Sequence, residues 1–253
     1  MLSNDSKKPL VCLFDSGIGG INLLCECVKK MPQVDFAYFA DNYNVPYGNL
    51  SGGELLSRTV KIFDKMSALN PAAAVVACNT VTAQCISALR ARYKFRIVGI
   101  QPAIKPAAAQ GDCIVLATPS TAESVAVREL TLKYGRGRTR VLPCPQLAAY
   151  IENNIFSLSE KALFNLLPQA DTEGVVLGCT HYTFIKNVIG AYYNCRVWDG
   201  IEGTTDHLRE ILGICDHLKP TLQKINFYSG NCAKNRRILN VLLAYGQDGF
   251  IVK

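Results

Sequence analysis

Long apolar runs are rare in this sequence, and so are histidine and tryptophan. The first apolar stretch, Pro9 to Phe14, follows Lys7 and Lys8 and is interrupted by Asp15, so it is too short for a signal-peptide core or a membrane span. The chain has only three histidines and one tryptophan, and it lacks the motifs C-x-x-C, H-E-x-x-H, G-x-G-x-x-G and G-x-S-x-G. These absences argue against a zinc site, a thioredoxin-type redox centre, a dinucleotide fingerprint and a serine hydrolase.

Cysteine is abundant, but its spacing is not that of a disulfide framework. Eleven cysteines are spread irregularly over 253 residues, and no secretory signal is recognisable before them. We therefore expect most of them to be free thiols and the protein to be cytoplasmic. Cys25 and Cys27 form a C-x-C pair on a predicted helix, where residues two apart do not share a face, so no metal is predicted.

Composition predicts a globular protein, and charge alone leaves the class of its partner open. Hydrophobic residues make up 49% of the chain and charged residues 19%, and the net charge of +7 leaves room for an anionic partner. The basic segment KYGRGRTR at 133–140 contains glycines typical of an exposed connection between a helix and a strand. Because it lacks the interleaved aromatics of an RNA-binding motif, we predict no nucleic-acid partner, and no membrane partner either.

Short β-branched segments alternate with longer segments of helical period along the whole chain, which is typical of an α/β fold with parallel sheets. The predicted strands are Leu10 to Phe14, Asp35 to Ala40, Ala73 to Ala77, Arg96 to Ile100, Cys113 to Ala117, Arg140 to Leu142, Val175 to Leu177, Arg196 to Trp198, Lys224 to Tyr228 and Phe250 to Val252. The predicted helices include Glu54 to Leu69, Thr82 to Tyr93, Thr121 to Tyr134, Thr183 to Tyr193 and Thr205 to Leu218.

The number of strands favours two doubly wound, flavodoxin-like sheets over one. A weak internal repeat supports this division, because AAAVVACNT and EGVVLGCTH both end a strand in a cysteine followed by a hydroxyl residue. We predict a first α/β domain of residues 1–98 plus 204–253, a second of residues 99–203, and an active site in the cleft between them.

Polar residues gather directly after the predicted strands, where open α/β sheets bind their ligands. They are Asp15 and Ser16, Asp41, Cys78 with Asn79 and Thr80, Thr118 and Thr121, and Cys179 with Thr180 and His181. The glycines of DSGIGG, which starts at Asp15, let a backbone approach a ligand, although a tight turn without a ligand explains them as well.

Cys78 and Cys179 are the candidate reactive groups. Each ends a strand and precedes a predicted helix, where the helix N-terminus lowers the pKa of a thiol. Any single cysteine here is more readily explained as a core thiol, but two in equivalent positions favour a reactive pair. His181 and Asp15 stand at strand ends beside them and could act as their acid or base partners, whereas His207 and His217 fall on predicted helix surfaces.

Four segments together resemble the glutamate racemases of the cofactor-independent aspartate/glutamate racemase family. They are FDSGIGG at 14–20, YFADNYNVPYG at 38–48, VVACNT at 75–80 and VLGCTHY at 176–182, in the family's order, with further support from Thr118, Thr121, Ser124 and Glu152. The resemblance implies an isomerase that interconverts L- and D-glutamate without pyridoxal phosphate or another cofactor, and that supplies D-glutamate for peptidoglycan. It is compatible with a homodimer.

The resemblance also implies roles for individual residues. The catalytic residues would be Cys78, Cys179, Asp15, His181 and Glu152. The substrate would be held by Asp15, Ser16, Tyr47, Gly48, Asn79, Thr80, Thr121, Thr180 and His181. Cys78, with Asp15 beside it, would deprotonate the D-enantiomer, and Cys179, with His181, the L-enantiomer.

The sequence departs from the family pattern at Asn44 and Leu50, where basic residues are common, and at Thr183, where proline is common. These changes bear on domain contacts and subunit arrangement more than on chemistry. Two other functions remain open: a racemase of aspartate or a related acidic amino acid, and a non-catalytic protein that binds an amino acid or nucleic acid.

Overall fold

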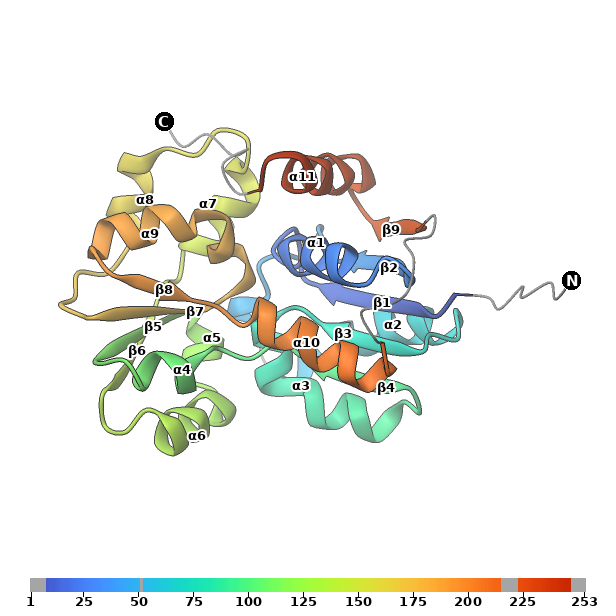
Figure 1. Ribbon diagram of the computed structural model, residues 1–253, viewed down its shortest axis with the longest axis horizontal. Coiled ribbons are helices and arrows are strands. Elements are labelled where there is room, and N and C mark those ends of the chain that lie inside the picture. The colour runs from blue at the N-terminus through green and yellow to red at the C-terminus, as the bar shows by residue number, and fades with distance from the viewer. Residues whose placement is uncertain (1–7, 51, 215–222, 247–253) are drawn as a thin grey trace, which may run out of the picture.

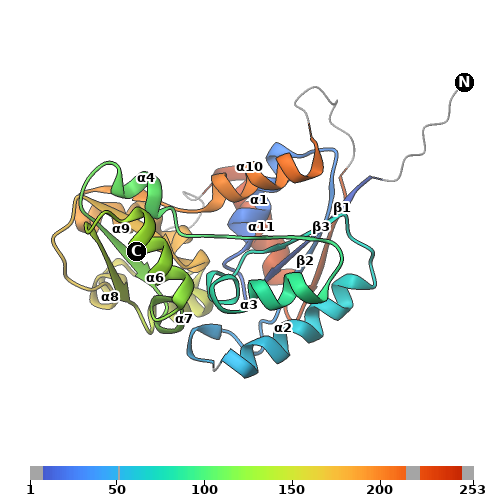
Figure 2. The ribbon, with the colours of Figure 1, turned by 90° about the horizontal axis from the view of Figure 1, so that it is seen from below.

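A computed structural model describes residues 8–50, 52–214 and 223–246, and it contains two parallel sheets with helices on both faces (Figures 1 and 2). The first sheet has the order β4-β3-β1-β2-β9 and consists of Arg96–Gly99, Ala73–Val76, Leu10–Asp15, Asp35–Ala40 and Ile225–Ser229. The second has the order β6-β5-β7-β8 and consists of Thr139–Pro143, Cys113–Ala117, Gly174–Gly178 and Arg196–Trp198. The predicted α/β class with two parallel sheets is therefore confirmed.

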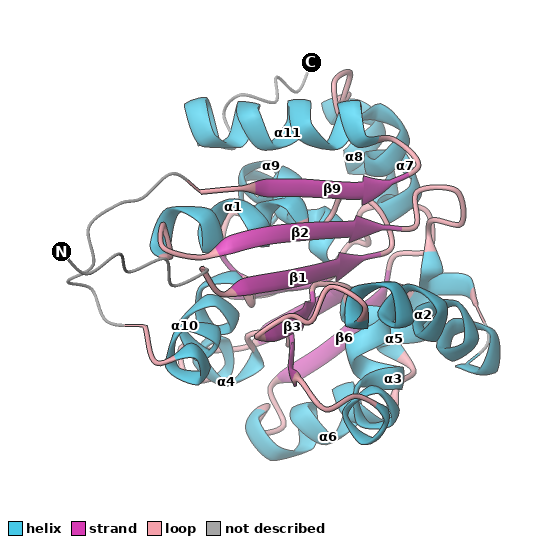
Figure 3. Ribbon diagram, turned by 90° about the vertical axis from the view of Figure 1, so that its right-hand side faces the viewer, coloured by secondary structure: helices cyan, strands magenta, loops and turns pink. Residues whose placement is uncertain are grey.

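The two sheets repeat one topology. Each sheet, together with the helices that pack on it, is called a unit: the first unit contains β1 to β4 and β9, and the second contains β5 to β8. In each unit the first strand lies between the second and the third, and the fourth lies beside the third, so β3 and β7 hold equivalent positions. Figure 3 shows the first-sheet strands running in one direction, with β9 added beyond β2. The pattern reverses between β1 and β3, and between β5 and β7, and sheets of this kind bind their ligands at the carboxyl ends of such strands.

Helices cover the sheets and account for most of the remaining chain. They are α1 (Ile21–Lys30), α2 (Gly52–Ser67), α3 (Asn79–Arg92), α4 (Ile104–Ala108), α5 (Pro119–Ala122), α6 (Val125–Tyr134), α7 (Leu147–Asn154), α8 (Glu160–Leu166), α9 (Lys186–Tyr193), α10 (Ile201–Leu212) and α11 (Cys232–Tyr245). Two 3₁₀ turns, η1 (Tyr47–Asn49) and η2 (Thr180–Ile185), lie after β2 and β7.

The alternation of side chains along β1 shows how the layers form. Val11 and Leu13 pack in the core beneath α1 and α11, whereas Cys12 and Phe14 pack on the other face beneath α2 and α3. Both faces are apolar because helices cover both, as in other parallel sheets. The core on the α1 face continues into the second sheet, where it includes Leu116.

The nine predicted strands within the described residues are confirmed, with ends shifted by at most one residue. The tenth, Phe250 to Val252, lies outside the described residues, as does His217. The helix predicted from Thr121 to Tyr134 is two helices, because the hydroxyl of Ser124 accepts a hydrogen bond from Val127 N and starts α6 separately.

Two further helix predictions need correction. The segment from Thr183 begins inside η2, and its α-helix starts only at Lys186. The last predicted helix starts earlier than expected, at Ile201, and ends at Leu212 before Gly213, whose φ of 64° suits glycine. No helix among the described residues is long and apolar enough to cross a membrane. The predicted domain boundaries, at 98/99 and 203/204, remain predictions.

Candidate active site

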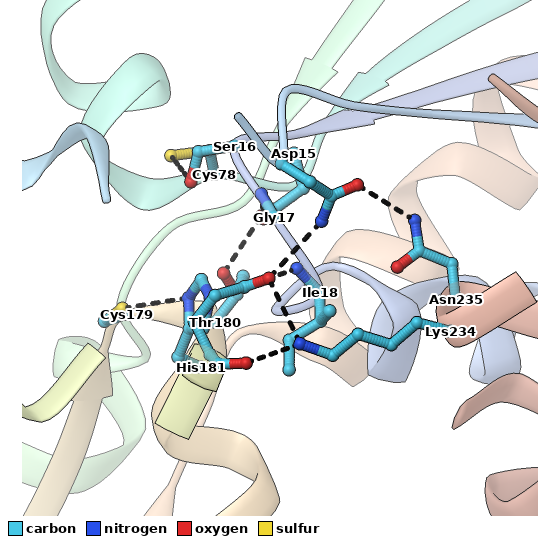
Figure 4. Close-up of polar contacts among 12 residues, drawn as sticks. Asp15, Ser16, Gly17, Ile18, Cys78, Cys179, Thr180, His181, Lys234 and Asn235 are labelled. Carbon is cyan, nitrogen blue, oxygen red and sulfur yellow. Dashed lines mark hydrogen bonds and ion pairs between the residues drawn. The ribbon is translucent and has the colours of Figure 1, made fainter. Parts of the chain in front are cut away.

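The strand-end residues of the two units meet between the sheets (Figure 4). Asp15, at the end of β1, accepts hydrogen bonds from Gly17 N at 2.8 Å and from the hydroxyl of Thr180, which follows β7, at 3.0 Å. The side chain of Asp15 is fully buried, and this burial raises its pKa, although His181, Gly17 and Thr180 act in the opposite direction. A carboxylate from one unit is thus bound directly by a hydroxyl from the other.

The glycines of DSGIGG are explained by this close approach. A Cβ atom on Gly17 would overlap the carboxylate of Glu152, and one on Gly19 would overlap the hydroxyl of Thr180 and lie 2.8 Å from Nδ1 of His181. Both positions therefore require glycine because side chains of the second unit occupy the space, independently of any ligand.

His181 forms the centre of a buried chain of contacts that starts at Cys179. Its Nδ1 lies 3.9 Å from the sulfur of Cys179, and its Nε2 lies 2.7 Å from Oε2 of Glu152 on α7. The side chains of His181 and Glu152 are only 3% and 6% exposed. Burial lowers the pKa of His181, but its hydrogen bonds to Cys179 and Glu152 outweigh burial and raise this pKa well above the ordinary value. The imidazole is therefore positively charged near neutral pH.

Glu152 is held as a carboxylate by several donors. Burial raises its pKa, but His181, the backbone N–H of Ile18 at 2.9 Å and Lys234 together outweigh burial and lower it. The chain from Glu152 through His181 therefore holds the imidazole beside the sulfur of Cys179.

Cys78 has a different environment. It caps the N-terminus of α3, and its S–H donates to the hydroxyl of Ser16 at 3.8 Å. Burial, the carboxylate of Asp15 and the charge of Cys179 raise the pKa of Cys78 to about 12, although the backbone N–H of Val81 lowers it. The expectation of a lowered pKa at this helix N-terminus is thus wrong for Cys78, because burial and the neighbouring anions outweigh the helix.

Cys179 is close enough to Cys78 to contribute to the raised pKa of that thiol. In Figure 4 both sulfur atoms lie on the same side of the network formed by Asp15 and His181. Of the two cysteines, only Cys78 stands at the N-terminus of an α-helix, because Cys179 precedes the 3₁₀ turn η2. In the part of the chain described, all ten cysteines are free thiols.

Three threonines form a second polar cluster beside Cys78. The hydroxyl of Thr80 lies 3.1 Å from that of Thr118 and 2.9 Å from that of Thr121, and all three side chains are buried. Thr80 belongs to the first unit and the other two to the second, so this cluster also spans the two. Asn79, the first residue of α3, is buried next to it.

Tyr47 and Gly48 lie in η1, at the edge of the same region. The hydroxyl of Tyr47 donates to Asp41 at 2.6 Å, and a Cβ atom on Gly48 would lie 2.6 Å from Cβ of Thr118. Outside this contact, Gly48 and Leu50 line a cavity of about 700 Å³ together with residues of α3, α5 and α6. The turn therefore lies between the threonine cluster and an open cavity.

Two departures from the family pattern have structural explanations. The hydroxyl of Thr183 donates to the carbonyl of Thr180 at 2.6 Å and accepts from Asn22 at 2.8 Å. These two hydrogen bonds stabilise the 3₁₀ turn, which a proline at this position would stabilise by restricting the backbone. The amide of Asn44 donates to both oxygens of Asp41, at 2.8 and 2.9 Å.

Sequence reasoning missed the side chains that surround Glu152. Asn42 donates to its Oε1 at 3.3 Å, and Lys234 of α11 donates to its backbone carbonyl at 2.6 Å. Asn42 lies within the segment YFADNYNVPYG, where its position after β2 was an available signal. Lys234 gives no such signal, because its partner lies in another unit and far away in the sequence.

Comparisons with known proteins identify the family of this chain. Residues 54–208 match the sequence model of the Asp/Glu/hydantoin racemase family, and the chain belongs to that family; it is an isomerase of the racemase class. Within the family it is similar to a glutamate racemase of Clostridium acetobutylicum, with 37% identity over 93% of this chain and 96% of the relative. It is also 37% identical to a glutamate racemase of Clostridium novyi, over 82% of this chain and 85% of that protein.

A solved structure extends the likeness to three dimensions. Escherichia coli glutamate racemase, in complex with L-glutamate and the activator UDP-MurNAc-ala, has a TM-score of 0.81 to this chain at 27% identity. The match covers 94% of this chain and 96% of that one. The correspondence therefore includes both sheets rather than a single motif.

Proposed function

We propose that this protein is a glutamate racemase that works through the two thiols Cys78 and Cys179. The observation that carries the proposal is their equivalence: each follows the third strand of a unit with the same strand order, and each has its own acidic or basic neighbour, Asp15 for Cys78 and His181 for Cys179. The glutamate racemases that are similar to this chain, one of them in complex with L-glutamate, support the choice of substrate.

The chemistry follows from the different neighbours of the two thiols. Racemisation removes the α-proton from one face of the substrate and returns a proton to the other face, which two groups on opposite sides achieve without movement of the substrate. Cys179, whose sulfur lies 3.9 Å from Nδ1 of His181, acts as the base toward L-glutamate. Cys78, whose pKa is raised to about 12, holds a proton and delivers it to the opposite face.

The reverse reaction uses the same groups in exchanged roles. After proton delivery Cys78 is a thiolate beside the carboxylate of Asp15, and its raised pKa makes it a strong base toward the α-proton of D-glutamate. Cys179 is then the proton donor.

Acid–base catalysis alone accounts for about 10²- to 10⁴-fold of the rate, so the site must also stabilise negative charge at the α-carbon. Backbone N–H groups after Cys78 and Cys179 would do this, because they lie at strand ends where carboxylates of the substrate would bind. The N–H groups of Gly17 and Ile18, which follow Ser16, already donate to Asp15 and Glu152. The residues proposed to hold the substrate are those the family resemblance implies, among them Thr80, Thr121 and Thr180.

The test is racemisation of L-glutamate, followed by circular dichroism, with solvent deuterium uptake at the α-carbon as a second measurement. Cys78→Ala and Cys179→Ala should each abolish racemisation, and the double variant should take up no deuterium. Cys85→Ala, which removes another buried thiol of α3, is the matched control and should remain active. Undiminished deuterium uptake in the double variant would refute the mechanism.

Two other functions are tested by the same preparation. Faster turnover of L-aspartate than of L-glutamate would identify an aspartate racemase. Binding of glutamate or nucleic acid without any turnover by the wild type would favour a non-catalytic protein, and the exposed segment 133–140 would then be the site to examine for nucleic acid. A role in supplying D-glutamate for peptidoglycan, and a cytoplasmic location, are part of the proposal for the glutamate racemase.

A further inference from the structure

Helix α11 of the first unit contacts α7 of the second through Lys234 (Figures 1 and 4). The ammonium group of Lys234 donates to the backbone carbonyl of Glu152 at 2.6 Å and lies 3.8 Å from Oε1 of the same residue. One cation from the last described helix therefore binds both the backbone and the side chain of a residue next to His181.

The position of this contact on α7 explains why a cation is favourable there. The helix ends at Asn154, so the carbonyl of Glu152 is one of the last four, which have no partner within the helix. Positive charge at a helix C-terminus is stabilising, and a lysine that donates to a terminal carbonyl acts as a cap. Lys234 thus fixes the backbone from which the Glu152 side chain projects.

A second route from α11 reaches the same carboxylate. Asn235, which is fully buried, donates to Oδ1 of Asn42 at 3.4 Å, and Asn42 donates to Oε1 of Glu152 at 3.3 Å. The other oxygen, Oε2, accepts from His181 and from Ile18 N. Both oxygens of the Glu152 carboxylate therefore accept hydrogen bonds, which fixes the orientation of the side chain.

We propose that Lys234 is a positioning residue for the racemase: it holds Glu152, and through it His181, in the arrangement in which Nδ1 faces Cys179. The inference rests on the proposed function. The inference predicts that α11 influences the chemistry of Cys179 and not that of Cys78, because the polar neighbours of Cys78 are Ser16 and Asp15.

Racemisation itself does not distinguish the two thiols. The enantiomers have equal free energy, so kcat/KM is the same in both directions for every variant.

Elimination from glutamate with chlorine on the β-carbon needs only one base. The thiolate takes the α-proton, the C–H electron pair forms a carbon–carbon double bond, and chloride leaves with its electron pair; the enamine then hydrolyses to a keto acid and ammonia.

The decisive experiment compares chloride release from the two enantiomers of β-chloroglutamate by the wild type, Lys234→Met, Lys234→Arg and Arg237→Met. Arg237 is the matched control, because it lies on the same helix and packs 4.1 Å from the ring of Phe156 near the end of α7, without contacting Glu152. Lys234→Met should slow elimination from the L-enantiomer about tenfold, as expected for loss of a charge-assisted hydrogen bond, and leave the D-enantiomer within about twofold of the wild type.

Lys234→Arg should restore most of the lost rate, and Arg237→Met should leave both rates unchanged. Equal losses for both enantiomers, no loss in Lys234→Met, or the same loss in Arg237→Met would overturn the inference. If Lys234→Met does not fold, Lys234→Gln, which keeps a donor but not the charge, gives the same comparison. No turnover of glutamate by the wild type would refute the proposed function as well, whereas the outcomes above refute only the role of Lys234.

Discussion

Replacement of Gly19 by alanine is the sharpest test of how the two units meet. The added methyl group would overlap the hydroxyl of Thr180 and lie 2.8 Å from Nδ1 of His181. Because such a contact requires about 3.5 Å, His181 would have to retreat by roughly 0.7 Å from the position in which it faces Cys179.

The size of the effect follows from this displacement. A misplacement of about 1 Å in a catalytic site lowers the rate on the order of 10²-fold, so kcat/KM of Gly19→Ala should fall by about 10- to 10²-fold. Overpacking costs about 1–3 kcal/mol of stability, or roughly 2–12 °C in Tm for a chain of this size.

The assay is racemisation followed by circular dichroism, together with thermal unfolding. Gly203→Ala is the matched control, because Gly203 lies on α10 with no atom within 4 Å of the added methyl group. That variant should gain about 0.5–1 kcal/mol of stability and keep its activity. Wild-type kcat/KM in Gly19→Ala would refute the contact between Gly19 and His181.

Three further outcomes are expected. Glu152→Gln should move the alkaline limb of the kcat/KM profile to lower pH. The pKa of His181 is held well above 6.5 by its bonds to Cys179 and Glu152, and it falls when the carboxylate is lost. The ion pair of His181 and Glu152 should stabilise the fold fully below pH 6.5, and this stabilisation should be lost as the pH rises through the folded pKa of His181. Because the pKa of Glu152 is lowered, acid should remove the stabilisation only below pH 4.5. Comparison of Tm between the wild type and Glu152→Gln across pH checks both limits. Thr121→Val should lower stability by about 1 kcal/mol and raise KM for glutamate about tenfold while kcat changes less, with Michaelis kinetics as the measurement.

Most of the fold could be predicted from local patterns of apolar and β-branched residues in the sequence. Strands such as Cys113–Ala117 are short, apolar and β-branched, and the crossover rule for parallel strands then leaves little freedom in topology. The break between α5 and α6 was missed because Ser124 fits a helical period as well as a cap, and the hydroxyl contact that decides between them is visible only in three dimensions.

The site was predictable to the extent that its residues stand at strand ends. Cys78, Cys179 and His181 carry this signal in their local sequence. The raised pKa of Cys78 was not predictable, because it depends on burial and on Asp15, which a helix-based argument ignores. Lys234 was not predictable either, since its contact with Glu152 exists only once the two units have assembled.

The return of the chain through β9 and α11 has a consequence for biosynthesis. Every group proposed to move a proton lies at or before His181, yet β9 at the edge of the described first sheet and the lysine that anchors Glu152 are translated later. At about 5–20 residues per second, a ribosome exposes both thiols several seconds before it releases the helix that completes their surroundings. A nascent chain therefore holds all of the reactive groups before it becomes an enzyme.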